Sequence, residues 1–175
     1  GRGGTAAAAQ GILDRLLGGG ESMGNFSISS VDDAALITLT NVPNTSAALA
    51  DIFTKLGGAS VNVDMICQTA PYKEKINLSF TIDQSDLTAT LTVVGGLKND
   101  YAGLMTEVSS GNCKFMIYSE LLKTRWGIAA RLFQALAANG LHMKLITTSD
   151  VEISLLFDHS DAGKVNAVLN AEFSD

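Results

Sequence analysis

The sequence lacks any apolar run close to the roughly 18–20 residues that a membrane-spanning helix needs, so we expect a soluble protein. It also lacks an excess of basic residues: the formal net charge is −6, whereas a partner with a phosphate backbone requires a basic face. Cysteine is scarce, and Cys67 and Cys113 lie in strand-like apolar runs, where we expect reduced core thiols. No secretory signal is recognisable, which favours a cytoplasmic location.

What is present is enough for folded domains, because 46% of the 175 residues are hydrophobic, too many for a disordered chain. Residues 1–24 differ from the rest: an alanine-rich, helix-prone stretch at Thr5–Leu17 lies between glycine-rich segments. Two interpretations of residues 1–24 stay open, a linker from a preceding domain or vector and fusion sequence. Neither interpretation gives them a part in the fold.

One stretch of the chain occurs twice. Residues 47–69 align with residues 127–149 without a gap, at an offset of 133 − 53 = 80 from Phe53 to Phe133. The first copy predicts a short amphipathic helix, a left-handed stop at Gly57-Gly58 and then a strand. A gapless match across helix, turn and strand indicates two copies of one structural unit.

The remaining segments extend each copy to the order strand–helix–strand–strand–helix, with one further strand. Two turns are predicted between strands, at Asp32-Asp33 and at residues 109–112. This order is the split βαβ pattern, so the predicted fold class is α+β, with two ferredoxin-like (βαββαβ) units whose helices cover one face of an antiparallel sheet. The predicted strands lie at 26–31, 35–40, 61–67, 78–82, 104–108, 113–118, 141–147 and 151–157, and the helices begin after Thr45, after Asp83 or Ser85, at Ile128 and after Asp158 or Ser160.

Three runs resemble the regulatory half of aspartate kinases: Val42-Pro43, residues 62–66 (Asn-Val-Asp-Met-Ile) with Gln68, and residues 146–154. That half is a tandem of ACT domains, small modules that bind amino acids and control metabolic enzymes. The resemblance implies that the first unit interrupts the second. We therefore expect a first ACT domain at residues 34–98 and a second one formed by residues 25–33 plus 99–175.

The catalytic domain of that family, which uses ATP to phosphorylate the side-chain carboxylate of aspartate, has no counterpart in this sequence. No glycine loop with a lysine precedes a helix, and Gly18-Gly19-Gly20 lacks the context of a phosphate-binding loop. We therefore expect a regulatory subunit or an excised regulatory domain, without kinase activity of its own and without a cofactor.

The resemblance also implies an effector, lysine or threonine, bound where the first loop meets its helix. The effector's carboxylate suits N–H groups at a helix N-terminus, and its ammonium suits acidic or amide oxygens. The family's loop usually reads Val-Pro-Asp-x-Pro-Gly; the neutral Asn44 stands here in place of the aspartate, which weakens binding about tenfold. The expected effector-binding residues are Asn44, Thr45, Ser46, Ala47, Asn62, Asp64, Gln68, Ser149 and Asp150.

The second loop, residues 119–127, departs further from the family pattern. Trp126 is large enough to fill a small amino-acid pocket, and Lys123 and Arg125 oppose the dipole of the following helix, so we interpret the loop as structural or as an interface. His142 and His159 are interpreted as surface residues. Neither stands at metal-ligand spacing from a cysteine, and no metal is expected.

The sequence thus predicts a regulatory region that binds an amino acid and provides allosteric feedback in the biosynthesis of the aspartate-derived amino acids. The alternatives are a ligand-free dimerisation scaffold or a regulator of another metabolic enzyme. A ferredoxin-like RNA-binding module is disfavoured by the acidic balance and by the lack of paired aromatic residues on a strand. The expected partners are a second copy of the chain in a two-fold homodimer, a kinase catalytic chain, or both, with no nucleic acid and no membrane.

Overall fold

The computed structural model describes residues 25–174, which form one six-stranded antiparallel sheet and four α-helices. The helix predicted at Thr5–Leu17 and both interpretations of residues 1–24 lie outside these residues. The strands are β1 (Ser27–Pro43), β2 (Val63–Gln68), β3 (Lys75–Asp83), β4 (Met105–Tyr118), β5 (Leu145–Thr148) and β6 (Glu152–Asp158). The helices are α2 (Ser46–Gly58), α3 (Leu87–Asp100), α4 (Ile128–Ala138) and α5 (Ala162–Glu172), and the 3-10 turns are η1 (Gln84–Asp86), η2 (Glu120–Lys123) and η3 (His159–Asp161).

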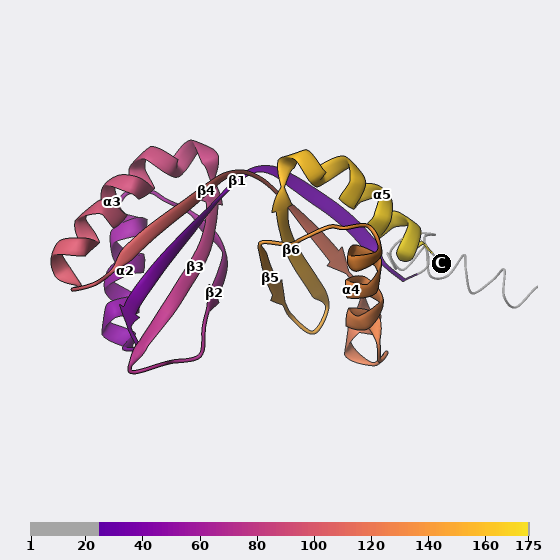
Figure 1. Ribbon diagram of the computed structural model, residues 1–175, viewed down its shortest axis with the longest axis horizontal. Coiled ribbons are helices and arrows are strands. Elements are labelled where there is room, and N and C mark those ends of the chain that lie inside the picture. The colour runs from indigo at the N-terminus through magenta and orange to yellow at the C-terminus, as the bar shows by residue number, and fades with distance from the viewer. Residues whose placement is uncertain (1–24, 175) are drawn as a thin grey trace, which may run out of the picture.

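The sheet has the strand order β2-β3-β1-β4-β6-β5, so the long strands β1 and β4 run through its centre. The second half of β1 pairs with β3, and its first half pairs with the second half of β4, as in the pair Val31–Lys114. On each side of the centre, four strand segments and two helices repeat the ferredoxin-like arrangement. The predicted fold class is confirmed, and Figure 1 shows the two halves side by side.

The two turns predicted at Asp32-Asp33 and at residues 109–112 are wrong. Both segments are kinks inside continuous strands: Asp33 has φ of 58°, Gly111 has φ of 72°, and the β1–β4 register shifts on either side of Ala34. Residues that favour turns also favour bulges, because both need a locally left-handed or irregular backbone. The kinks bend the sheet without breaking it, and this bend separates the two halves.

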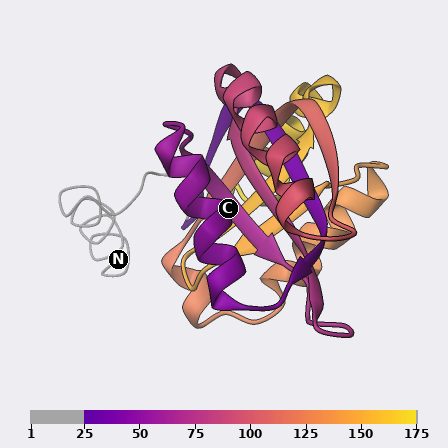
Figure 2. The same cartoon turned by 90° about the vertical axis from the view of Figure 1, so that its left-hand side faces the viewer.

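Each half has its own apolar core between its helices and its side of the sheet. The first core includes Ile52, Leu56, Phe80 and Leu97. The second core includes Phe115, Ile117, Leu132, Leu155, Phe157, Val165 and Leu169. The helices lie on the outer sides of both halves, with the uncovered sheet faces turned toward each other (Figure 1). A view onto the first half shows α2 and α3 in front of its strands (Figure 2).

A small third cluster joins the two inner sheet faces. It consists of Ala34 and Leu36 from β1 and Leu156 from β6, with Leu145 packed against them. The edge strands β2 and β5 approach each other as well. Because these contacts link strands of the two halves directly, we expect a structural change in one half to alter the structure of the other.

The predicted left-handed stop at Gly57-Gly58 is displaced in the structure. Both glycines belong to α2, and the left-handed residue is Ser60, with φ of 60°. Gly140, with φ of 65°, occupies the position 80 residues later. In both copies the next N–H group, of Val61 or of Leu141, donates to a carbonyl oxygen at the end of the helix at 3.0 Å, a closure that requires the left-handed residue.

The threonine-rich helix α3 is confirmed. Thr90 Oγ1 donates to the Asp86 carbonyl oxygen at 2.8 Å, and Thr92 Oγ1 donates to the Thr88 carbonyl oxygen at 3.1 Å, so these hydroxyl groups are satisfied within the helix. The strand predicted at 141–147 is shorter than expected, because β5 begins only at Leu145. Within residues 25–174, no helix combines the length and the apolar character needed to cross a membrane.

The core contacts bear on where the two units divide. Helix α3 runs to Asp100, beyond the expected boundary at residue 98, and Leu104 belongs to the first core. We therefore propose that the first unit comprises residues 34–112 and the second comprises residues 26–33 plus 113–174. The division then passes through the kinks of β1 and β4.

Candidate functional site

The loop at Asn44–Ala47 runs from the end of β1 into the first turn of α2, and its four residues are exposed. Thr45 is the N-cap of α2, and its Oγ1 accepts the Ala48 N–H group at 3.1 Å. The Asn44 N–H group donates to the Glu74 carbonyl oxygen at 3.0 Å. The threonine hydroxyl thus already uses one of the helix N–H groups that the sequence assigned to an effector carboxylate.

Asn62 and Asp64 lie at the opposite end of the first unit, beside the bend of the sheet. They line a cavity of about 160 Å³ together with residues of β1, β3 and β4. The half-exposed carboxylate of Asp64 accepts the Lys114 ammonium at 2.8 Å, and the Lys114 side chain is only 12% exposed. Since Lys114 comes from the second unit, this ion pair joins the two units.

A bulge in β2 determines which residues of this strand lie on the same face of the sheet. Val63 pairs with Ile82 and Ile66 pairs with Phe80, with a register shift between them. Directly paired residues point to the same side, so Val63 and Ile66 face the helices, and Met65, on the opposite side, faces the inner sheet surface. The regular alternation of a strand predicts that Val63 and Met65 share one face, and the structure shows this prediction to be wrong, because the bulge adds a residue between them.

The other predicted site residues are spread over the molecule. Gln68 ends β2 opposite Leu78, near the outer end of the first unit. Ser149 and Asp150 form the turn between β5 and β6, where Ser149 Oγ accepts the Glu152 N–H group at 3.1 Å. Ser149 is thus a turn-forming residue of the second unit.

The register of the sheet shows how far apart the predicted residues lie. Val63 and Ala35 both pair with Ile82, so the start of β2 is level with the start of the second half of β1. Asn44 follows the far end of that strand, about 25 Å away at the usual rise per strand residue. One free amino acid therefore cannot touch both Asn44 and Asp64 of the same chain.

The cavity beside the bend, which is the central cavity of the molecule, is also lined by three carboxylates that were not predicted as site residues: Asp32, Asp33 and Asp83. Asp83 Oδ1 accepts the Ser85 N–H group at 2.9 Å, and the hydrogen bonds from Ser85 hold the pKa of Asp83 below its usual value. Asp32 lies 3.3 Å from the ring of His159. The Asp32-Asp33 pair was taken for a turn, and nothing in the sequence places Asp83 beside it.

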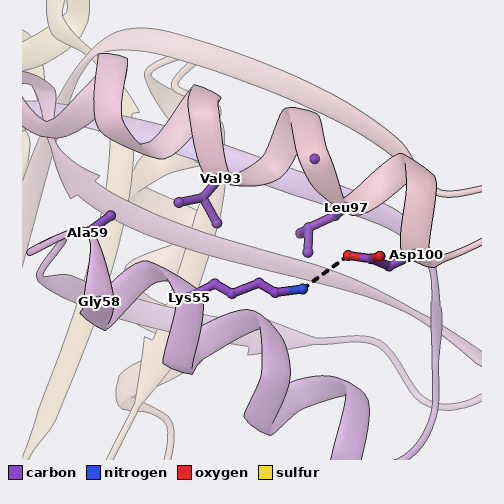
Figure 3. Close-up of a pocket in the computed structure, with 7 residues that line it drawn as sticks. Lys55, Gly58, Ala59, Val93, Leu97 and Asp100 are labelled. Carbon is purple, nitrogen blue, oxygen red and sulfur yellow. Dashed lines mark hydrogen bonds and ion pairs between the residues drawn. The ribbon is translucent and has the colours of Figure 1, made fainter.

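A second cavity, of about 360 Å³, is a groove between α2 and α3 (Figure 3). Lys55 reaches from α2 across this groove, and its Nζ lies 3.0 Å from both Asp51 and Asp100. Tyr101 donates to Asp51 at 2.7 Å, and this bond, followed by the one from Lys55, lowers the pKa of Asp51. The charges of the groove thus satisfy one another.

The central cavity is therefore the better candidate site. It contains four carboxylates and a single ammonium, from two units and four strand segments, in a volume suited to a small molecule. Such a set of groups can accept the hydrogen bonds of a cationic donor and can offer Lys114 to an anionic group. Asn62 and Asp64 are the predicted site residues that it brings together.

Comparisons with known proteins agree with the fold. A family model described as "ACT domain" matches residues 115–173, within the second unit. The aspartokinase of Bacillus sp. (strain MGA3) is 34% identical over 144 residues, which make up 81% of this chain and 34% of that protein. The chain thus spans about a third of the length of this curated relative.

Solved structures give the same picture. The regulatory subunit of aspartate kinase from Thermus flavus superimposes with a TM-score of 0.77 at 23% identity, covering 85% of this chain and 99% of that one. E. coli aspartokinase III in complex with lysine and aspartate has a TM-score of 0.67 at 19% identity, covering 85% of this chain and 33% of that one. The repeated fold, the family model and the identity to aspartokinases together show that this chain is an ACT-domain protein related to the regulatory regions of aspartate kinases.

Proposed function

We propose that this chain is the regulatory module of an aspartate kinase, which binds lysine or threonine and passes feedback control to a kinase catalytic region. The observation that carries the proposal is the 34% identity to a bacterial aspartokinase over 144 residues, a length that exceeds either unit alone. The chain corresponds to about a third of that relative, so we assign the phosphorylation of aspartate by ATP to a separate region or chain.

A free amino acid offers two charges that a regulatory site can recognise. Its ammonium is a threefold donor that suits carboxylate and amide oxygens, such as those of Asp64 and Asn62. Its carboxylate suits an ammonium, and Lys114 lies within the same cavity. The lysine complex of E. coli aspartokinase III, a protein of similar fold, supports lysine as one of the two effectors to be tested.

The loop at Asn44–Ala47 can contribute to the same effector site only from a second chain, because about 25 Å separates it from Asp64 within one chain. β2 and β5 are the terminal strands of the sheet order, and an open strand edge can pair with another chain. Isologous pairing gives a two-fold homodimer. We propose such a dimer, alone or with a kinase catalytic chain; a monomer in light scattering, with and without amino acids, contradicts the homodimer.

The experiment is a titration of the purified chain with L-lysine and L-threonine, followed by calorimetry and by thermal unfolding. An effector at 100 times its dissociation constant stabilises the folded state by about 2.7 kcal/mol, because it binds the folded state alone. Asp64→Asn should weaken this binding, whereas Asp150→Asn, in the β5–β6 turn, should leave it unchanged. If Asp150→Asn alone weakens binding, the effector belongs to the second unit.

A ligand-free scaffold is the second candidate. Trp126 is 96% exposed on the loop before α4, which is typical of an interface residue, and Asn44 lacks the charge of the family's aspartate. If none of the twenty amino acids shifts the melting temperature while the chain stays dimeric, the scaffold replaces the effector module. Either candidate predicts no aspartate-dependent release of ADP by the purified chain, which a coupled assay measures.

A further inference from the structure

One lysine of the second unit reaches into the first unit beside the bend of the sheet. Lys144 comes directly before β5, and its N–H group donates to the Leu156 carbonyl oxygen at 2.7 Å, so its backbone belongs to the sheet of the second unit. Its ammonium donates to Asn112 Oδ1 at 2.6 Å and to Ser109 Oγ at 3.0 Å, both in the part of β4 that we assign to the first unit. A third contact, to Asp158 Oδ2 at 3.3 Å, stays within the second unit. The three donors of the ammonium thus connect the two units.

The two acceptors from the first unit form the kink of β4. Ser109 and Asn112 lie on either side of Gly111, whose φ of 72° takes the strand out of its regular course. The Asn112 side chain is completely buried, and its Nδ2 donates to the Ser109 carbonyl oxygen at 2.7 Å while its Oδ1 accepts the ammonium. A buried amide oxygen that loses its donor costs free energy, so the ammonium of Lys144 stabilises this shape of the kink.

The first unit also contacts this kink through a residue of its own. The Gly111 N–H group donates to Gln84 Oε1 at 3.0 Å, and Gln84 begins η1, which leads directly into α3. The kink is therefore linked to the edge strand β5 through Lys144 and to the start of α3 through Gln84. A shift of β5 moves the backbone of Lys144, and the ammonium passes this shift to the kink.

The corresponding positions of the first unit cannot form the same contact. Asp64 stands 80 residues before Lys144 and carries the opposite charge. Ala34 is the counterpart of Asn112, since these two residues pair with each other where the equivalent strands β1 and β4 cross the bend, and alanine has no side-chain acceptor. The contact is thus specific to the kink of β4, and the fold accepts an alanine at the equivalent place.

We propose that Lys144 is the residue that couples the two units, because it fixes the kink of β4 and with it the angle between the two halves of the sheet (Figure 1). Each apolar core is built from its own unit, and Lys144 contributes to neither. Removal of the ammonium should therefore change the orientation of the units while each unit keeps its fold. The coupling is a property of the chain without an effector, so it stands apart from the proposed function. A regulatory module needs such a contact to pass a change from one unit to the other.

The test measures the relative orientation of the two units in the full chain by residual dipolar couplings of the backbone amides. Lys144→Met keeps a long unbranched side chain and removes the ammonium, and Lys164→Met, at an exposed lysine of α5, is the matched control. We expect the couplings of each unit to fit that unit's own structure in all three proteins. In Lys144→Met alone, we expect the units to be rotated relative to each other by more than the difference between parent and control.

A second variant removes the contact from the other side. Asn112→Ala introduces the residue that the first unit has at Ala34, so we expect it to fold. It should rotate the units as Lys144→Met does, and the double variant should show no further rotation, because both substitutions break one contact. If Lys144→Met does not fold, Asn112→Ala is tested by the same measurement.

The other ion pair between the units provides a comparison. Lys114 binds Asp64 at 2.8 Å, but the Asp64 side chain is 56% exposed, and exposed ion pairs contribute little. We therefore expect Lys114→Met to rotate the units less than Lys144→Met does. An equal or larger rotation would show that the coupling does not depend on Lys144.

Two further results would overturn the inference. If Lys144→Met or Asn112→Ala folds with the orientation of the parent, Lys144 is a stabilising contact only, even where the urea midpoint is lower. If the rotations of the two single variants add in the double variant, the two residues act through separate contacts.

Discussion

The two units share a backbone and differ in where they place their charges. Ser60 and Gly140 occupy the same left-handed position, 80 residues apart. Each unit also has an ion pair between its helices, Lys55 with Asp100 in the first and Arg131 with Glu172 in the second. The comparison shows that the repeat preserves helix packing and chain reversal, which the fold needs. The charge of a side chain beside the sheet bend, by contrast, changes sign between the units, as from Asp64 to Lys144.

The first helices of the two units also begin differently. α2 begins with the side-chain cap of Thr45, whereas α4 begins after Gly127, whose φ is 80° and which has no side chain to cap the helix. The loop before α4 exposes Trp126, while the loop before α2 carries small polar residues. The two loops therefore present different surfaces, and the units need not bind the same partner.

The largest expected effect tests whether the two cores unfold together. Ile52→Ala in α2 and Leu132→Ala in α4 each remove a fully buried side chain, at a cost of about 2–5 kcal/mol. Because one sheet runs through both units, we expect a single transition in urea for each variant. Circular dichroism reports on the whole chain, and backbone amide NMR signals of each core, followed through the urea titration, report on the two units separately; separate midpoints would show that the units unfold independently. Phe133→Ala, at an exposed position of α4, is the control.

A smaller, opposite pair of effects is expected at the left-handed residues. Ser60→Gly should stabilise the chain and Gly140→Ser should destabilise it, each by about 1 kcal/mol, because only glycine adopts this conformation without a Cβ penalty. Urea denaturation measures both. Effects of the same sign would show that the two turns are not equivalent.

Helix composition gives a further matched pair. Gly96 in α3 has no atom within 4 Å of an added Cβ, and Ala171 holds the corresponding place in α5. Gly96→Ala should stabilise the chain by about 0.5–1 kcal/mol and Ala171→Gly should destabilise it by a similar amount. Thermal unfolding measures the difference; a loss of stability in Gly96→Ala would mean that the groove between α2 and α3 does not tolerate a methyl group.

The smallest expected effect is a difference in acid stability. The pKa of Asp158 is lowered from 3.8 to about 2 by Ser160 and then by Lys144, so its stabilising contribution is complete above pH 3.8 and is lost as the pH falls toward 2. Asp158→Asn should therefore flatten the dependence of stability on pH in this window. Asp83→Asn should flatten it less, because the pKa of Asp83 is lowered by Ser85 alone. Urea midpoints between pH 2 and pH 5 measure both slopes.

Periodicity and the repeat were enough to predict the helices and the fold class, but not the continuity of β1 and β4. The helix at Ile128–Ala138 was predicted with its observed start, since its apolar residues recur at helical spacing from Ile128 onward. The stop at Gly57-Gly58 was misplaced, because a glycine pair suggests a left-handed residue while Ser60 adopts that conformation under the constraint of the following strand. Local sequence thus specified the helix but not the residue that bears the strain.

For the candidate site, the sequence by itself determined that Asn62 and Asp64 come shortly after the first helix, as polar residues in the otherwise apolar strand predicted at 61–67. Only the tertiary structure decided what lies opposite them. Strand register, shifted by the kinks at Asp33 and Gly111, brings Lys114 to Asp64 across 50 residues of chain. Register depends on pairings between distant strands, and a shift of one residue turns every side chain to the other face, so no local pattern contains it.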